Sequence, residues 1–123
     1  MLSSQRLLII ESEFLIALEI QRIVEEANAS QTVFARDFRE AAELAERFPE
    51  FDLAIINPPL GDDHAIAVAA RLASAGAAIV VCTAGPVPNI TGTPLQGAEL
   101  VRKPFADDEL LAACQRALAK TRN

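Results

Sequence analysis

Short apolar runs alternate along the chain with segments in which apolar residues recur at helical spacing. Five such runs predict strands, at residues 7–10, 32–35, 52–56, 78–82 and 98–101. Helical spacing predicts four helices, at residues 14–27, 41–46, 65–75 and 107–119. Because strands and helices alternate, we expect a parallel sheet with helices on both faces. The central strands agree, since strands that are apolar at every position are usually covered on both sides.

The leading topology is a flavodoxin-like, doubly wound α/β sheet of five parallel strands in the order 2-1-3-4-5, joined by right-handed crossovers. The helix ends carry their own signals. Pro49 is expected to stop the second helix and Gly76 to end the third. Asp107 or Asp108 is expected to cap the last helix.

One segment breaks the alternation. A further helix would be expected between the fourth and fifth strands, but three prolines and two glycines stand among residues 85–96. In a helix interior a proline costs about 3 kcal/mol and a glycine about 1 kcal/mol relative to alanine. We therefore predict a loop, or at most one short turn, in place of this fourth helix.

Length and composition narrow the class of protein. With 123 residues, 51% of them hydrophobic, residues 1–123 are expected to form a single domain. The net charge of -6 and the lack of a basic stripe make nucleic-acid binding by this chain unexpected. Met1 and the charged tail resemble true chain ends, so no DNA-binding domain is expected to follow the last helix.

Several features favour a cytoplasmic protein. Cys82 and Cys114 do not have metal-ligand spacing, and we expect two buried, reduced thiols. The N-terminus lacks the pattern of a signal peptide. No apolar stretch reaches the roughly 18 residues of a membrane span. His64 follows two aspartates without a third ligand at helical spacing, so it is interpreted as part of a polar helix start.

Polar residues stand at or just after the ends of four predicted strands. They are Glu11 and Ser12, Asn57, Thr83 and Lys103. In a doubly wound sheet, sites form beyond the carboxyl ends of the strands. Taken singly, these are ordinary loop, strand-end and surface residues. Their joint order along the chain predicts a common site.

This ordered set, with Lys103-Pro104-Phe105 after the fifth strand, resembles the receiver (CheY-like) domain of two-component response regulators. The resemblance covers nearly the whole chain and implies a signal-transduction module rather than an enzyme. In receivers, two acids after the first strand and an aspartate after the third hold a magnesium ion. The aspartate accepts a phosphoryl group from a histidine kinase or a small phosphodonor. A Ser or Thr and a Lys contact the phosphoryl oxygens.

The carry-over of these roles to this chain is partial. Glu11 matches the first acid, but Ser12 falls at the second and Asn57 at the phosphoacceptor. The other matched positions are Glu13, which continues the acidic run, Pro59, whose carbonyl would face the metal, the phosphate-contact residues Thr83 and Lys103, and Leu100, where a Tyr or Phe usually reports the switch.

The departures predict a degenerate site. Two of the usual three carboxylates are missing, so Mg²⁺ is expected to bind at most weakly through Glu11, Asn57 and Pro59, and no other cofactor is expected. The amide of Asn57 is a poor nucleophile, and Pro58 lacks the backbone N–H that deamidation would need. We expect no phosphorylation there. A Glu11–Lys103 bridge, shared with Asn57, is expected to replace the metal and lock one conformation.

Three functions remain open. The first is a stand-alone receiver-like module in a two-component (phosphorelay) context, acting by contact with a histidine kinase or another signalling protein. Receivers usually present the fourth helix, fifth strand and last helix, here rebuilt by residues 85–94, and this change puts a homodimer through that face in doubt. The second is a phosphorelay receiver modified at another residue, such as Ser12 or Thr83. The third is a small-molecule-binding flavodoxin-like protein. It is ranked last because the loops after the first and third strands are short and leave little room for a ligand.

Overall fold

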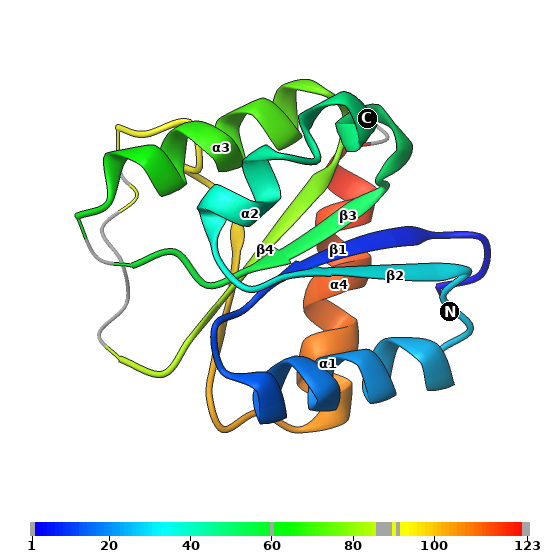
Figure 1. The fold of residues 1–123 in the computed structure, drawn as a ribbon. Coiled ribbons are helices and arrows are strands. Elements are labelled where there is room, and N and C mark those ends of the chain that lie inside the picture. Colours follow the sequence, from blue (N-terminus) through cyan, green and yellow to red (C-terminus); the bar gives the residue numbers. More distant parts are fainter. Residues whose placement is uncertain (1, 60, 86–89, 91, 122–123) are drawn as a thin grey trace.

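The computed structural model describes residues 2–59, 61–85, 90 and 92–121, and its centre is one sheet of five parallel strands. The strands are β1 (Arg6–Ile10), β2 (Gln31–Ala35), β3 (Leu53–Ile56), β4 (Ala78–Thr83) and β5 (Glu99–Arg102), in the order β2-β1-β3-β4-β5. The helices are α1 (Phe14–Glu26), α2 (Phe38–Ala42), the 3₁₀ helix η1 (Ala45–Glu50), α3 (Asp63–Ser74) and α4 (Asp107–Thr121). The fold predicted from the sequence is confirmed (Figure 1).

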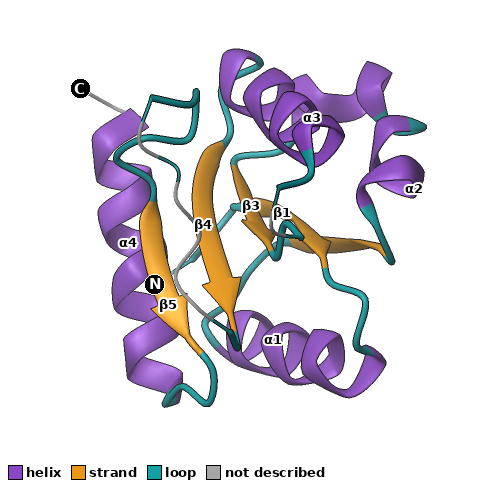
Figure 2. Cartoon of the chain, turned by 90° about the vertical axis from the view of Figure 1, so that its left-hand side faces the viewer, coloured by secondary structure: helices purple, strands orange, loops and turns teal. Residues whose placement is uncertain are grey.

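The sheet separates two layers of helices. Helices α1 and α4 cover one face, and α2 and α3 cover the other (Figures 1 and 2). Along β1, Leu7 and Ile9 point into the core on the α1/α4 side, while Leu8 and Ile10 point to the opposite core. Every residue of β3 and β4 is buried. Two cores on either side of one sheet explain why these strands are apolar throughout.

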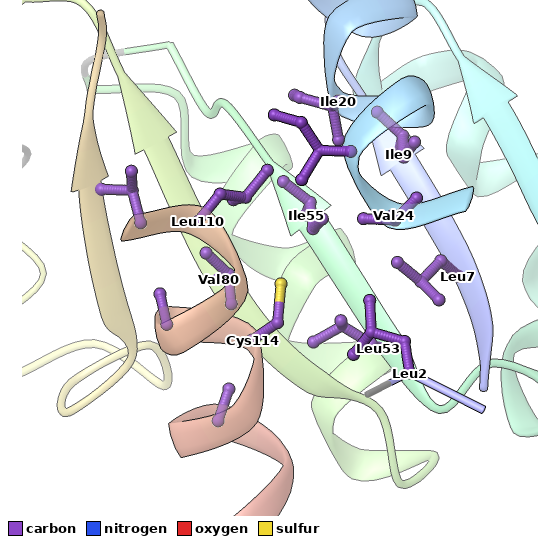
Figure 3. Close-up of a cluster of buried hydrophobic side chains, with 14 of the residues drawn as sticks. Leu2, Leu7, Ile9, Ile20, Val24, Leu53, Ile55, Val80, Leu110 and Cys114 are labelled. Carbon is purple, nitrogen blue, oxygen red and sulfur yellow. The ribbon is translucent and has the colours of Figure 1, made fainter. Parts of the chain in front are cut away.

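The core on the α1/α4 side is built from aliphatic side chains. Figure 3 shows Leu110 and Cys114 of α4 and Ile20 and Val24 of α1 converging on the central strands. Cys114 is fully buried, as is Cys82 on β4, and both are free thiols, as predicted. A cysteine here packs as a small apolar residue.

The second helix differs from its prediction. It begins earlier, at Phe38, because Asp37 caps it by accepting a hydrogen bond from the backbone N–H of Glu40 at 2.8 Å. Pro49 does not stop a helix but lies inside η1. A short 3₁₀ turn tolerates the proline, and Phe48 beside it is buried against the α2/α3 core.

The predicted cap of the last helix is also wrong. Neither Asp107 nor Asp108 caps α4, because Asp107 is already its first helical residue. Instead, the carboxylate of Glu109 reaches back and accepts a hydrogen bond from the backbone N–H of Ala106 at 3.0 Å. This is the return half of a capping box. Gly76 does end α3 as predicted, at a φ of +108° that favours glycine.

The connection between β4 and β5 contains turns and no helix in its described residues, 84, 85, 90 and 92–98, as predicted. Residues 86–89 and 91 lie outside the described part. Three backbone turn bonds, each at 3.0 Å, order the rest: Thr93 N–H donates to the carbonyl of Ile90, Gln96 N–H to that of Thr93, and Ala98 N–H to that of Leu95. Ile90 and Leu95 are buried in the α2/α3 core. Side chains of a loop thus fill part of the space a helix would cover.

No helix in the described part of the chain is both long enough and apolar enough to cross a membrane.

Candidate functional site

The carboxyl ends of β1, β3, β4 and β5 bring together four of the predicted site residues, Glu11, Asn57, Thr83 and Lys103. Ladder-type hydrogen bonds continue one residue beyond the strands and fix three backbones. The N–H of Glu11 donates to Ala35, that of Asn57 to Ile10 at 3.1 Å, and that of Lys103 to Thr83 at 2.8 Å. These bonds fix the backbone positions from which the side chains of Glu11, Asn57 and Lys103 project. The sequence prediction of a shared location is borne out by this geometry.

Glu11 and Lys103 form a buried ion pair at this edge. The ammonium Nζ of Lys103 lies 2.5 Å from Oε1 of Glu11, and the two side chains are 6% and 1% exposed. The second carboxylate oxygen, Oε2, accepts a hydrogen bond from the backbone N–H of Glu13 at 3.1 Å. Both oxygens of Glu11 are therefore engaged within the protein. The bridge that the sequence predicts is present, and burial leaves each charge dependent on the other.

Asn57 joins this pair through its amide. With Oδ1 turned toward Lys103, it accepts a hydrogen bond from Nζ at 3.2 Å, and Nδ2 donates to the backbone carbonyl of Cys82 at 3.0 Å. The reversed amide would place Oδ1 against the carbonyl oxygen of Cys82 and Nδ2 against the ammonium of Lys103. It would keep only a 3.5 Å contact from Nδ2 to Glu11. Hydrogen-bond satisfaction therefore selects the first orientation. The carbonyl of Cys82 is a partner that the sequence did not predict, since backbone acceptors leave no sequence signal.

Cys82 and Thr83 end β4 next to this cluster. Burial raises the pKa of the Cys82 thiol to about 12, although the charge of Lys103 opposes the shift. The thiol is thus a neutral neighbour at physiological pH and not a thiolate nucleophile. Thr83 is 6% exposed and closes the strand, and its backbone carbonyl holds the N–H of Lys103. A phosphate contact through the side chain of Thr83 stays a prediction.

The remaining predicted residues lie around the cluster. Ser12 is exposed and shares a hollow of about 230 Å³ with Asn57, Pro59 and His64. The carbonyl of Pro59 accepts a hydrogen bond from the N–H of Asp62 at 3.3 Å. Asp62 caps α3, so His64 lies in a polar helix start as interpreted from the sequence.

Two predicted residues lie apart from the ion pair. Glu13 is exposed and contributes only its backbone N–H to Glu11. Leu100, at the expected switch position, is 38% exposed on β5. It lines a separate hollow with Arg102 and Arg116.

The residues at this edge do not fit a magnesium ion. Magnesium requires several hard oxygen ligands in octahedral geometry. The one carboxylate here, Glu11, already binds an ammonium and a backbone N–H, and the carbonyl of Pro59 is used in a turn. Among residues 2–121 that are described, no group of three or more His, Cys, Asp or Glu side chains could hold a metal.

This chain is similar to solved structures of several receiver domains. A response regulator receiver protein from Sinorhizobium medicae superposes with a TM-score of 0.80 at 16% identity, covering 98% of this chain and 99% of its own. The signal receiver domain of an HD domain-containing protein from Pseudomonas fluorescens gives 0.77 at 22%, covering 97% and 98%. The signal receiver domain of a histidine kinase from Syntrophus aciditrophicus gives 0.73 at 24%, covering 95% and 92%.

These similarities confirm a receiver (CheY-like) fold over nearly the whole chain. No protein-family model and no curated protein matches the sequence. At these low sequence identities the similarities establish the fold alone. The roles of individual residues rest on the geometry of the site.

Proposed function

We propose that this chain is a receiver-like signalling domain in a two-component context that works by protein contact, without catalytic turnover and without phosphorylation at residue 57. The observation that carries the proposal is the placement of the Lys103 ammonium between Glu11 and Asn57, 2.5 Å from the Oε1 atom of Glu11. In this arrangement the ammonium of Lys103, which is part of the chain, takes the role of a bound cation. The conformation that it stabilises needs neither metal nor phosphoryl group.

The chemistry of residue 57 supports this proposal. Phosphoryl transfer to a protein needs an anionic or activated nucleophile and positive charge to neutralise the transferring group. Asn57 offers a neutral amide whose oxygen accepts from Lys103 and whose nitrogen donates to Cys82. Lys103 is itself neutralised by Glu11. Residue 57 therefore offers no anionic nucleophile, and the positive charge of Lys103 is already paired with Glu11.

A function by contact is supported by the exposed apolar face of α1. Phe14 is 72% exposed, Leu15 79% and Leu18 41%, on neighbouring positions of one helix. Clusters of large exposed apolar side chains mark interaction surfaces. We propose a histidine kinase or another signalling protein as the class of partner. The buried free thiols of Cys82 and Cys114 suit a reducing cytoplasm as the location.

The test is incubation with acetyl phosphate and Mg²⁺, followed by intact-mass measurement. We expect the mass to stay unchanged, because residue 57 is a neutral amide and the carboxylate of Glu11 is already held by Lys103 and the N–H of Glu13. A receiver domain with its aspartate intact, treated in parallel, serves as positive control. A gain of one phosphoryl group would contradict the proposal. If fragmentation placed that group on Ser12 or Thr83, the alternative of a phosphorelay receiver modified elsewhere would be correct instead.

A further inference from the structure

Strand β2 forms one edge of the sheet and lacks the features that usually protect such an edge. It has β1 on one side and, within the described part of the chain, no strand on the other (Figure 1). Its five residues, Gln31–Ala35, include no charge and no proline. All five pair in register with β1, so no bulge interrupts the strand. Because natural proteins usually block exposed edges with charges, prolines or bulges, the β2 edge is open to another strand.

The opposite edge of the sheet, β5, is protected by charge. This strand begins with Glu99 and ends with Arg102. Glu99 also binds Arg116 at 2.7 Å and Lys120 at 2.5 Å, so two cations of α4 lie beside the strand. Pairing with another strand here would remove charged groups from water, which is unfavourable. Each chain therefore has one edge that admits a partner strand and one that resists it.

Backbone geometry determines which groups of β2 face outward. The carbonyl of Ala35 accepts a hydrogen bond from the N–H of Glu11, so Ala35 turns its backbone groups toward β1 and its continuation. Successive residues of a strand turn these groups to opposite sides, and Thr32 and Phe34 therefore direct theirs away from β1. In an antiparallel pair of two β2 strands centred on Val33, Thr32 of each copy would lie opposite Phe34 of the other and exchange two hydrogen bonds with it.

The side chains on the α1 side of this edge suit such a pair. Phe34 is 36% exposed and lines a hollow of about 280 Å³ together with Phe14, which is 72% exposed. Thr32 lies on the same side of the sheet, where its hydroxyl donates to the carboxylate of Glu25 at 3.2 Å. Antiparallel pairing would cover Phe34 with Thr32 of the other copy. Cross-strand pairs of an aromatic and a β-branched residue stabilise antiparallel sheets.

The charges beside β2 are complementary in the same arrangement. Arg36 directly follows the strand, and its side chain is 85% exposed although it binds Glu40 of its own chain at 3.1 Å. Antiparallel pairing places Arg36 diagonally across from Thr32 of the other copy, within reach of Glu25 beside it. Two-fold symmetry forms this contact twice. The net charge of -6 opposes association at long range, but salt screens it beyond roughly 8 Å at physiological ionic strength.

We propose that two copies of this chain pair through their β2 edges, antiparallel and centred on Val33, so that their sheets join into one. This inference goes beyond the proposed function and does not depend on it, because the pairing residues lie outside the Glu11–Lys103 pair. The assembly closes at two copies, since each chain has a single open edge. A five-residue edge is short, so we expect the association to be reversible.

Association is tested by sedimentation equilibrium of the unmodified chain from the micromolar to the millimolar range, where we expect a monomer–dimer equilibrium. Phe34→Lys places a charge on the β2 edge and should weaken the dimer at least about tenfold. Leu100→Lys is the matched control on β5, because Leu100 is 38% exposed against 36% for Phe34, and it should leave the dimer unchanged. Circular dichroism verifies that both variants are folded.

The register is tested by exchanging the two charges. Arg36→Glu and Glu25→Arg should each weaken the dimer, and the combined variant should restore it, since the pair then forms with its signs reversed. A folded combined variant that associates as weakly as either single variant would overturn the register centred on Val33.

Hydrogen exchange gives a readout that needs no variant. The N–H groups of Thr32 and Phe34 should exchange more slowly as the protein concentration rises, because each becomes bonded to the other copy. The N–H groups of β5 should exchange at the same rate throughout. A dimer without concentration-dependent protection of Thr32 and Phe34 would use another surface and would overturn the proposal.

Two sedimentation results would also overturn it. One is a chain that stays monomeric over the whole concentration range. The other is a dimer that Leu100→Lys disrupts and Phe34→Lys leaves intact, because its interface would then include β5. These outcomes are separate from the phosphodonor test. A gain of phosphoryl mass would refute the proposed function and leave the β2 dimer standing, whereas absence of the dimer would refute this inference alone.

Discussion

Residue 57 shows how one amide differs from the carboxylate it resembles in shape. Nδ2 of Asn57 donates to the carbonyl of Cys82, and Oδ1 accepts from Lys103. An aspartate could make the second contact but would turn its other oxygen toward a carbonyl oxygen. It would also place a second negative charge beside Glu11, with only Lys103 to neutralise both. Asparagine is therefore the residue that this cluster requires.

We predict that Asn57→Asp destabilises the protein by about 1–3 kcal/mol, the usual cost of leaving a buried acceptor unsatisfied, with attraction to Lys103 offsetting part of it. Urea denaturation of the purified variant measures this change. Asn28→Asp is the control, because Asn28 is exposed at a φ of +73° that aspartate also tolerates. A variant as stable as the parent would show that the Cys82 contact is not needed.

Removing the lysine from the buried pair should have a larger effect. Lys103→Ala leaves Glu11 buried with an unneutralised charge, and we expect a loss of about 3–5 kcal/mol in the free energy of unfolding. Lys120→Ala removes a comparable contact to Glu99, but the Lys120 side chain is 56% exposed, so it should change stability by less than about 1 kcal/mol. Thermal denaturation of both variants separates the two cases. Equal melting temperatures for Lys103→Ala and the parent would contradict the role given to the bridge.

The residue scale also shows where prediction from sequence ends. Glu11 and Lys103 could be paired in advance, because both follow strands of a parallel sheet and a buried lysine needs an anionic partner. The carbonyl of Cys82 and the N–H of Glu13 could not be predicted. Every residue carries the same backbone groups, so only the folded geometry shows which ones a side chain reaches.

At the scale of elements, the connection between β4 and β5 departs most from regular alternation. Its prolines and glycines predicted the absence of a helix, which the described residues confirm. What fills the space was not predictable. Leu95 is 2% exposed and packs in the α2/α3 core although it belongs to a turn. The same composition that prevents a helix gives no period from which a buried position can be identified.

We therefore expect Leu95→Ala to behave as a core substitution. Leu-to-Ala changes in cores cost about 2–5 kcal/mol, whereas exposed positions usually change stability by less than about 0.5 kcal/mol. Leu100→Ala, with the side chain 38% exposed, is the matched control five residues further along. Chemical denaturation measures both. If the two variants lost similar stability, the segment would not contribute to the core as the structure indicates.

The α2 region shows the opposite kind of outcome. Helical spacing and Pro49 predicted one helix at 41–46, but capping by Asp37 moves the start of α2 forward to Phe38, and η1 continues through the proline. Local sequence signals compete in this region. The Asp37 cap and the burial of Phe48 outweigh the tendency of Pro49 to end a helix. The ends of the five strands were predicted to within one residue, since no competing signal interrupts their apolar runs.

At the scale of the whole molecule, folding changes the pKa values of the two cysteine thiols. Cys82 on β4 and Cys114 on α4 both face the α1/α4 core. Burial raises the pKa of each thiol from its ordinary value of 9.0 to about 12. In the unfolded chain both thiols are exposed to water and titrate near the ordinary value. Folding and thiol ionisation are therefore linked.

The sign of this linkage follows from the raised pKa values. Below about pH 9 both states keep their thiol protons, and the thiols do not make stability depend on pH. Between about pH 9 and pH 12 the unfolded state loses protons that the folded state retains, so stability falls as pH rises. The slope approaches about 1.4 kcal/mol per pH unit for each thiol. Urea denaturation from pH 8 to pH 11 should show this fall, and the double variant Cys82→Ala/Cys114→Ala should show a shallower one. Parallel curves for the parent and the double variant would mean that the thiols are not shielded by the core.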